Sequence, residues 1–197
     1  PKVCLCLWYN EIMKTSLHAL DNGLKVLFVD TKAFPSVTSL VLIGAGSRYE
    51  TPENNGVAHF FEHMAFKGSK RYPSTFDIAS AIDSFGGINN AFTSKDYTGY
   101  WIKSPVQHVE KSLDILADMI QQPLLKEEDI KTESGVILEE INMYEDNPGR
   151  DIYDIFETIM YSGSPLQMPI IGTKQTVSSF KSRTFRDYID KHYSPSN

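Results

Sequence analysis

Two histidines and a glutamate stand close together in the segment His59-Phe-Phe-Glu-His63. Residues three and four positions apart lie on one face of a helix, so His59, Glu62 and His63 are expected to project together. Two imidazoles one helical turn apart can chelate a zinc ion, and a carboxylate beside them can accept a proton. The spacing therefore predicts a metal site with an acid–base group next to it.

The segment that carries these side chains has the pattern of a buried helix. Residues 56–67 are predicted to form a helix that ends at Gly68, and within 57–66 the side chains are apolar nearly all round apart from the three polar groups. Burying imidazoles and a carboxylate without partners is unfavourable, so a bound ion is expected to compensate them. The alternative is a pair of core histidines with ordinary hydrogen-bond partners.

A third ligand is expected on another buried face, because a catalytic zinc ion usually has three protein ligands and a water. Residues 126–145 have a helical pattern, and on its wheel Glu133 and Glu140 lie close to the apolar Ile137 while Glu139 points the opposite way. Glu140 is therefore the candidate ligand. Glu133, two turns earlier on the same face, is a candidate partner of a ligand. The alternative for both is a Lys or Arg partner at a solvated edge.

The elements that must position these groups indicate an α+β domain. Strand patterns at 24–30 and 37–43 predict the two-stranded start of a sheet, and 88–94 with 97–103 predict a second hairpin. Because strands and helices are segregated along the chain, we expect a mostly antiparallel sheet with helices packed on one face. Further helices are expected at 74–85, 105–121, 151–161 and 183–192.

Composition and charge exclude several classes of protein. The 197 residues are 41% hydrophobic and 22% charged, which is typical of one globular unit and not of a disordered chain. The formal net charge of -6 opposes nucleic-acid binding. No apolar run approaches the roughly 20 residues of a membrane span, so no membrane association is expected. Cys4 and Cys6 are too close together to staple a fold, which favours a reducing compartment.

The two ends of the chain give expectations about domain limits and location. Residues 1–12 are interpreted as a leader or an added segment, and 13–197 as the domain. The chain stops at Tyr193-Ser-Pro-Ser-Asn197, which approaches a strand that does not follow, so the domain is expected to be cut before its last strand. No signal or transit sequence is recognisable after Met13. We therefore expect a bacterial cytoplasmic protein, with the mitochondrial matrix and the periplasm as alternatives.

Three segments together resemble the inverted-motif zinc peptidases, the family of pitrilysin, insulin-degrading enzyme and the mitochondrial processing peptidase. They are residues 55–68 around the two histidines, 86–94, and 136–140. The resemblance runs from about residue 17 to residue 197 and implies the N-terminal half of a two-half subunit. In this family the third zinc ligand follows the second histidine by 77 positions, a count that leads from His63 to Glu140. The resemblance also assigns Glu133 to an additional glutamate that supports catalysis.

The resemblance implies a zinc endopeptidase with one Zn²⁺ per chain. His59, His63 and Glu140 would hold the ion, and Glu62 would act as general base toward a zinc-bound water that attacks a peptide bond. The alternative is a noncatalytic subunit or peptide-binding partner of a heteromeric processing peptidase.

The substrate and the partners are implied in the same way. Asn90 and Ala91 would lie on an edge strand where an unstructured peptide, or an unstructured segment of a protein, adds through main-chain hydrogen bonds. From the sequence alone this segment is an ordinary hairpin strand. The expected partner is a homologous C-terminal half or partner subunit, with a homodimer as the other arrangement.

Overall fold

The computed structural model describes residues 13–197, so the expected leader at 1–12 lies outside the described residues. Its strands are β1 (Lys14–Ala19), β2 (Lys25–Asp30), β3 (Ser36–Ile43), β4 (Ile88–Thr93) and β5 (Thr98–Pro105). Its α-helices are α2 (Val57–Met64), α3 (Thr75–Asp83), α4 (Val109–Gln121), α5 (Glu127–Glu145), α6 (Pro148–Met160), α7 (Lys174–Ser179) and α8 (Ser182–His192). Short 3-10 turns are η1 (Ser47–Tyr49), η2 (Val106–His108) and η3 (Pro165–Gln167). The predicted helices are thus confirmed with shifted ends, and the short α7 was not predicted.

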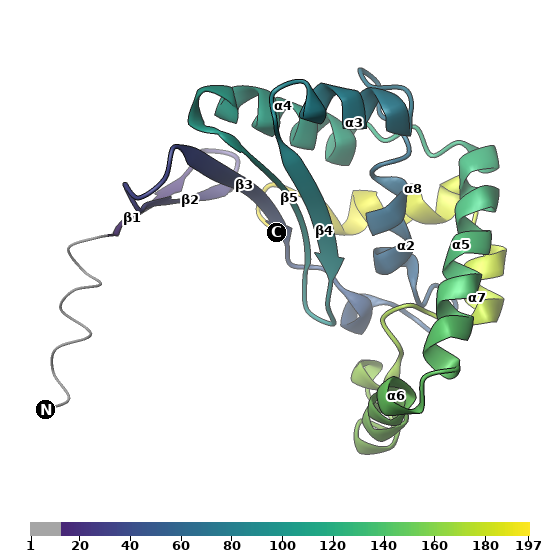
Figure 1. Ribbon diagram of the computed structural model, residues 1–197. Helices are drawn as coiled ribbons and strands as arrows, with labels where there is room; N and C mark the ends of the chain where they lie inside the picture. The colour runs from purple at the N-terminus through teal and green to yellow at the C-terminus, as the bar shows by residue number, and fades with distance from the viewer. Residues whose placement is uncertain (1–12) are drawn as a thin grey trace, which may run out of the picture.

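The larger sheet has three antiparallel strands in the order β3-β5-β4 (Figure 1). The predicted hairpin of β4 and β5 is confirmed, with Asn90 opposite Trp101 and Ala91 opposite Tyr100. Among the described strands, β4 has a partner on one side only. Its other edge is therefore available for pairing with another chain.

The predicted two-stranded start of the sheet is wrong in its pairing. β2 pairs with β1 in a separate hairpin, from Lys14 opposite Asp30 to Ala19 opposite Lys25. β3 pairs with β5, from Ser36 opposite Pro105 to Ile43 opposite Thr98. The tight Asn22-Gly23 turn closes the β1–β2 hairpin, where Gly23 has a left-handed φ of 91°. A turn of this kind pairs a strand with its immediate predecessor, which accounts for the pairing of β2 with β1.

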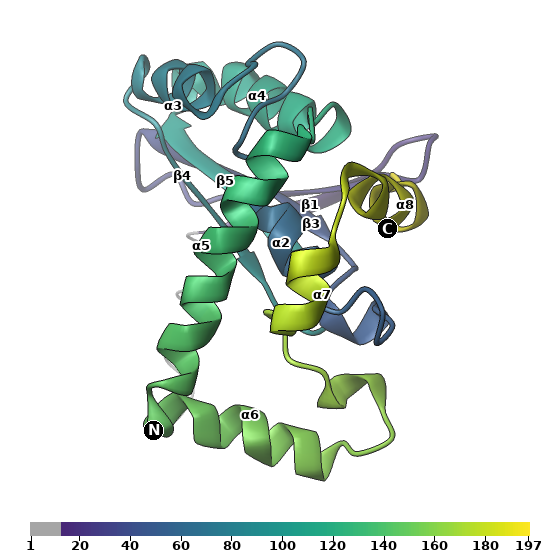
Figure 2. The same cartoon turned by 90° about the vertical axis from the view of Figure 1, so that its right-hand side faces the viewer.

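The helices cover one face of the larger sheet, as expected for the α+β class (Figures 1 and 2). On β5, the side chains of Tyr100 and Ile102 are fully buried beneath this layer, and the Phe61 ring of α2 meets Tyr100 edge-on at 6.3 Å. On the opposite face, Leu40 and Leu42 of β3 are 50% and 52% exposed.

Helix α2 lies in the middle of the domain. Its side chains pack on the sheet through Phe61 and on the C-terminal part of the chain through Phe60, whose ring lies 5.1 Å from that of Phe185 in α8. Helix α5 contacts α2 as well and buries its stripe of Ile130, Ile137 and Ile141. A helix enclosed in this way is apolar nearly all round, as its sequence predicts.

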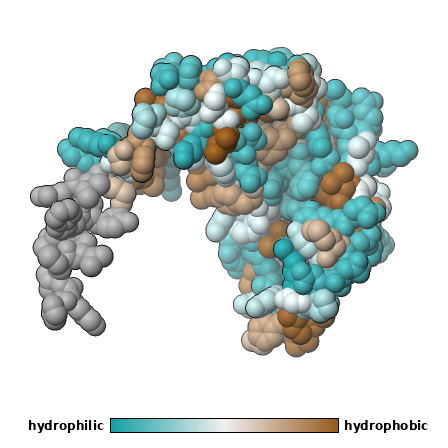
Figure 3. Space-filling model, in the orientation of Figure 1, coloured by the Kyte–Doolittle hydropathy of each residue, from teal (hydrophilic) through white to brown (hydrophobic). Residues whose placement is uncertain are grey.

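Helix α6 turns away from the end of α5 and contributes no buried side chain (Figure 2). Apolar side chains of this helix are exposed, among them Phe156 and Ile159. Figure 3 shows hydrophobic surface at the lower end of the molecule, where α6 lies in Figure 1. Within residues 13–197, no helix has the length and apolarity needed to cross a membrane.

Candidate metal and active site

A buried carboxylate accepts hydrogen bonds from the start of α2, the helix that carries both histidines. Glu50 is 5% exposed, and its Oε2 accepts hydrogen bonds from the Gly56 amide at 2.8 Å and the Asn55 side-chain amide at 2.9 Å. Its Oε1 accepts one from the Ala58 amide at 2.8 Å. Burial raises the pKa of Glu50 to about 7, although the three hydrogen-bond donors lower this pKa in part. The contacts satisfy amide groups at the helix start and so fix the turn that holds His59.

The structure brings the two histidines together with Glu140 of α5. One ligand atom from each of the three residues lies within 4.8 Å of the others. Glu140 Oε2 is 3.8 Å from Nε2 of His59 and 3.8 Å from Nε2 of His63. These separations are too long for hydrogen bonds and close to the spacing of about 3.4 Å between two ligands of a tetrahedral zinc ion.

The environment of His59 suits a metal ligand. Burial, followed by repulsion from His63, lowers the pKa of His59 to about 4, so the ring is neutral near pH 7 and keeps a lone pair for a metal ion. Its Nδ1 is buried and has no hydrogen-bond partner among the described residues. The Nε2 atom, which faces Glu140, has no hydrogen-bond partner there either, so the alternative of a core histidine with ordinary hydrogen-bond partners does not apply to His59. Two imidazoles and a carboxylate are a donor set that fits Zn²⁺.

Glu133 lies behind His63 on the same helix as Glu140. Its Oε1 accepts a hydrogen bond from His63 Nδ1 at 2.9 Å, and its Oε2 lies 2.5 Å from Lys67 Nζ. Burial raises the pKa of Glu133, but the hydrogen bond from His63 and the ion pair with Lys67 outweigh burial and hold this pKa below its ordinary value. A carboxylate that accepts the proton of Nδ1 leaves Nε2 free to bind a metal ion.

The foreseen alternative of a Lys or Arg partner applies to one of the two glutamates. Glu133 has such a partner in Lys67, although it is buried and not at a solvated edge. For Glu140 no ion pair with Lys or Arg occurs in the part of the chain that the structure describes. Its Oε1 instead accepts a hydrogen bond from the Tyr144 hydroxyl. Burial and this bond raise the pKa of Tyr144 to about 12, so the hydroxyl stays a donor.

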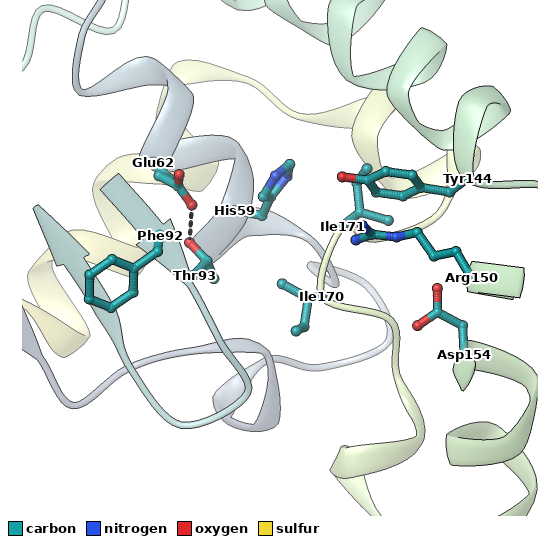
Figure 4. Close-up of a pocket in the computed structure, with 9 residues that line it drawn as sticks. All are labelled: His59, Glu62, Phe92, Thr93, Tyr144, Arg150, Asp154, Ile170 and Ile171. Carbon is teal, nitrogen blue, oxygen red and sulfur yellow. Dashed lines mark hydrogen bonds between the residues drawn. The ribbon is translucent and has the colours of Figure 1, made fainter. Parts of the chain in front are cut away.

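Glu62 lies beside the three-residue cluster and is not one of its members. Its Oε2 accepts a hydrogen bond of 2.5 Å from the Thr93 hydroxyl of β4, drawn dashed in Figure 4. Burial raises the pKa of Glu62, and the bond from Thr93 lowers it less than burial raises it. A carboxyl group with a raised pKa is better able to exchange a proton near neutral pH.

A cavity opens between the edge strand and the corner of α5 and α6 (Figure 4). Phe92 and Thr93 of β4 line one side, and Tyr144, Arg150 and Asp154 line the other. The remaining lining residues are His59, Glu62, Ile170 and Ile171. The candidate metal ligand His59 and the candidate base Glu62 therefore face one open space together with an edge strand.

The predicted substrate contacts lie on this edge strand, next to the cavity. Asn90 and Ala91 precede Phe92 on β4, and the Ala91 amide donates to Oδ1 of Asn90 at 2.8 Å. The residues of β4 that line the cavity are Phe92 and Thr93, which sequence reasoning did not single out. It also missed Glu50 and Arg150, and no spacing in the sequence marks either residue. Tyr144 could have been found, because it follows Glu140 by one helical turn on the predicted stripe.

Comparison with known proteins agrees with these observations. The family model described as insulinase (peptidase family M16) matches residues 25–174. The chain is 41% identical over 178 residues to an uncharacterized zinc protease, YmxG, of Bacillus subtilis, covering 90% of this chain and 43% of that protein. It is 37% identical over 183 residues to the β subunit of the mitochondrial-processing peptidase of Bos taurus, covering 93% of this chain and 37% of that protein.

A solved structure of a protease from Helicobacter pylori superimposes with a TM-score of 0.88 at 29% identity, covering 94% of this chain and 45% of that chain. The chain thus spans less than half the length of these relatives. The family model covers most of this chain, including both histidines and Glu140. The chain therefore belongs to the insulinase family of zinc peptidases, peptidase family M16, as its resemblance implied.

Proposed function

We propose that this chain is the catalytic N-terminal half of a zinc endopeptidase that hydrolyses peptide bonds in unstructured peptides or protein segments. The observation that carries the proposal is the meeting of His59, His63 and Glu140 with Glu62 beside them at an open cavity. Membership of the family and relatives named as zinc proteases support the class of reaction.

His59, His63 and Glu140 would hold one Zn²⁺, which when bound polarises a carbonyl group and lowers the pKa of a water molecule. Glu62 would accept the proton of the attacking water on its carboxylate and pass it to the leaving amine. Thr93 would hold the Glu62 carboxylate toward the cavity through its hydrogen bond. Glu133 would support the site by orienting the ring of His63.

The substrate would bind as an additional strand. β4 has an unpaired edge beside the cavity, and an extended peptide can add to such an edge through main-chain hydrogen bonds. Asn90 and Ala91 would contact this peptide. Segments already paired in a folded protein could not bind in this way, so unstructured substrates would be preferred.

The partner would be a homologous second half. Residues 13–197 would make up one half of the active unit, since the chain covers less than half of its relatives. Some proteins of this kind are themselves subunits, as the name of the mitochondrial-processing peptidase β subunit says. We take the second half to close the cavity over the substrate.

Hydrolysis of a quenched, unstructured peptide tests the proposal. The zinc-loaded chain is assayed alone and with the C-terminal half of a full-length relative, using Glu62→Gln as the blank and the exposed Glu139→Gln as the matched control. We expect turnover with the added half, a loss of about 10²- to 10⁴-fold in Glu62→Gln, and little change in Glu139→Gln. Zinc content should stay the same in all three proteins. Absence of Glu62-dependent turnover with zinc bound would refute the proposal and leave the noncatalytic, peptide-binding subunit.

A further inference from the structure

We propose that Arg150 makes this cavity selective for peptides that carry an Asp or Glu side chain opposite α6. The inference rests on the proposed function, because it assumes that a peptide lies along β4. It adds a recognition site for a carboxylate on the side of the cavity away from the edge strand.

The guanidinium group of Arg150 is held in place by an aromatic ring. Its Cζ atom lies 3.5 Å from the centroid of the Tyr144 ring, a stacking distance. The Tyr144 hydroxyl in turn donates to Glu140, so Arg150 is linked to the candidate metal cluster through one residue. Stacking covers one face of the planar guanidinium and leaves the N–H groups along its edge free to donate.

Arg150 also lacks an acidic partner in the part of the chain that the structure describes. Three other arginines of residues 13–197 form ion pairs: Arg48 with Asp96, Arg71 with Asp114 and Asp118, and Arg183 with Asp187. Arg186 instead donates to the backbone carbonyl groups of Pro123 and Leu124. No such pair involves Arg150. A guanidinium that is fixed, faces a cavity and has free donors is suited to bind a carboxylate from outside, because its planar fork can donate two parallel hydrogen bonds.

The position of Arg150 relative to β4 suggests which part of a peptide it would meet. In Figure 4, β4 lies on one side with Glu62 bonded to Thr93, Arg150 lies on the other side, and His59 lies between them. Side chains of an added strand alternate in direction, so every second one would point toward the α6 side. Ile170 and Ile171 line the same cavity, and apolar lining residues limit water and strengthen a charge pair.

Asp154 is the competing feature of the same wall. It lines the cavity one helical turn after Arg150, and its carboxylate would favour a basic side chain. Two observations favour Arg150 as the selecting residue. It is stacked on Tyr144, which holds a candidate metal ligand, whereas no hydrogen bond or ion pair of the Asp154 side chain occurs among the described residues. A preordered group loses less entropy on binding than a free one.

Peptide binding measured without hydrolysis tests the inference. Every protein carries zinc, the Glu62→Gln change and the C-terminal half of a full-length relative, so that binding is read separately from turnover. Fluorescent peptides differ at one position only, with Glu, Gln or Lys, and the position is moved along the peptide. At one position we expect Glu to bind about tenfold more tightly than Gln by anisotropy titration.

Charge variants then identify the residue responsible. Arg150→Ala should abolish the preference for Glu over Gln, and Arg150→Glu should reverse it toward Lys. Arg150→Lys should keep only part of it, because an ammonium group cannot donate as a planar fork. The matched control is Arg183→Glu on α8, a charge reversal at a side chain that is 84% exposed and pairs with Asp187, and it should leave the preference unchanged.

The outcomes separate this inference from the proposed function. Equal binding of Glu and Gln peptides at every position, or an equal effect of Arg183→Glu, would overturn the role of Arg150. A preference for Lys that disappears in Asp154→Asn would overturn it too and assign recognition to Asp154. Neither result depends on turnover, so loss of selectivity and loss of peptidase activity are distinguishable.

Discussion

Replacing Glu133 by glutamine tests whether a buried carboxylate sets the metal affinity of the site. Glu133 is 4% exposed and lies between His63 Nδ1 at 2.9 Å and Lys67 Nζ at 2.5 Å. Glutamine keeps the shape of the side chain and an oxygen that can accept from His63. It removes the negative charge that makes Nε2 of His63 a stronger ligand.

The size of the effect follows from these contacts. Changing a hydrogen-bond partner of a metal-binding histidine typically weakens metal affinity by about 10- to 100-fold, which corresponds to about 1.4–2.7 kcal/mol. Because Gln keeps a neutral hydrogen bond to His63, we expect a loss near the lower limit. Glu133→Ala leaves Nδ1 without an acceptor and should come near the upper limit. Lys67 is partly exposed and regains water, so the broken ion pair adds little.

The assay is a competition titration of zinc against a chromophoric chelator at neutral pH. Glu139→Gln is the matched control, since it removes the same charge from an exposed position of the same helix. Urea unfolding of the zinc-free proteins checks that each variant is folded. Unchanged zinc affinity in Glu133→Gln, or an equal loss in Glu139→Gln, would refute the argument.

Two further predictions concern the support of the site. Glu50→Ala should lower the free energy of unfolding by about 3 kcal/mol in urea titrations, because it leaves the Gly56 and Ala58 amides and the Asn55 side chain without their buried acceptor. A loss below about 1 kcal/mol would contradict this role. Burial raises the pKa of Asp118, but hydrogen bonds from Ser69 and Arg71 hold it below its ordinary value. The stability that Asp118 contributes is therefore complete above the unfolded pKa of about 4 and is lost as the pH falls through the lower folded pKa. Asp118→Asn should be less stable at neutral pH and lose less stability on acidification, measured by unfolding at several pH values; a parallel loss in both proteins would contradict the prediction.

The fold could be predicted where its signals are local. The helix at 56–67, the hairpin of residues 88–94 and 97–103 and the helix at 126–145 each follow from periodicity and from turn or end residues within the segment itself. The pairing of β3 could not be predicted, because its partner β5 is distant in the sequence. Alternation of apolar and polar residues predicts a strand but does not indicate which other strand it pairs with. The six-residue α7 is too short for its periodicity to be visible.

In the candidate site too, the local features could be predicted from the sequence and the long-range ones could not. The placement of His59, Glu62 and His63 follows from one helical turn, and the inward direction of Glu133 and Glu140 follows from the phase of one long helix. What the sequence could not show is how these two helices cross. The crossing puts His63 between the two glutamates, with Nδ1 on Glu133 and Nε2 toward Glu140.

The wall of the cavity opposite β4 is formed where α5 meets α6, and its position could not be predicted from helix periodicity. Helix α5 ends at Glu145, and the chain turns at Asn147 and Pro148 into α6 (Figure 2). This turn brings the guanidinium of Arg150 onto the ring of Tyr144. A corner between helices has no periodic signal, and its direction is set by tertiary contacts. Candidate metal ligands on helices can therefore be proposed from helix phase, whereas a candidate substrate-selecting residue at a corner between helices requires the structure. The variants of Arg150 therefore probe the wall of the cavity formed by the corner of α5 and α6, which no pattern in the sequence predicts.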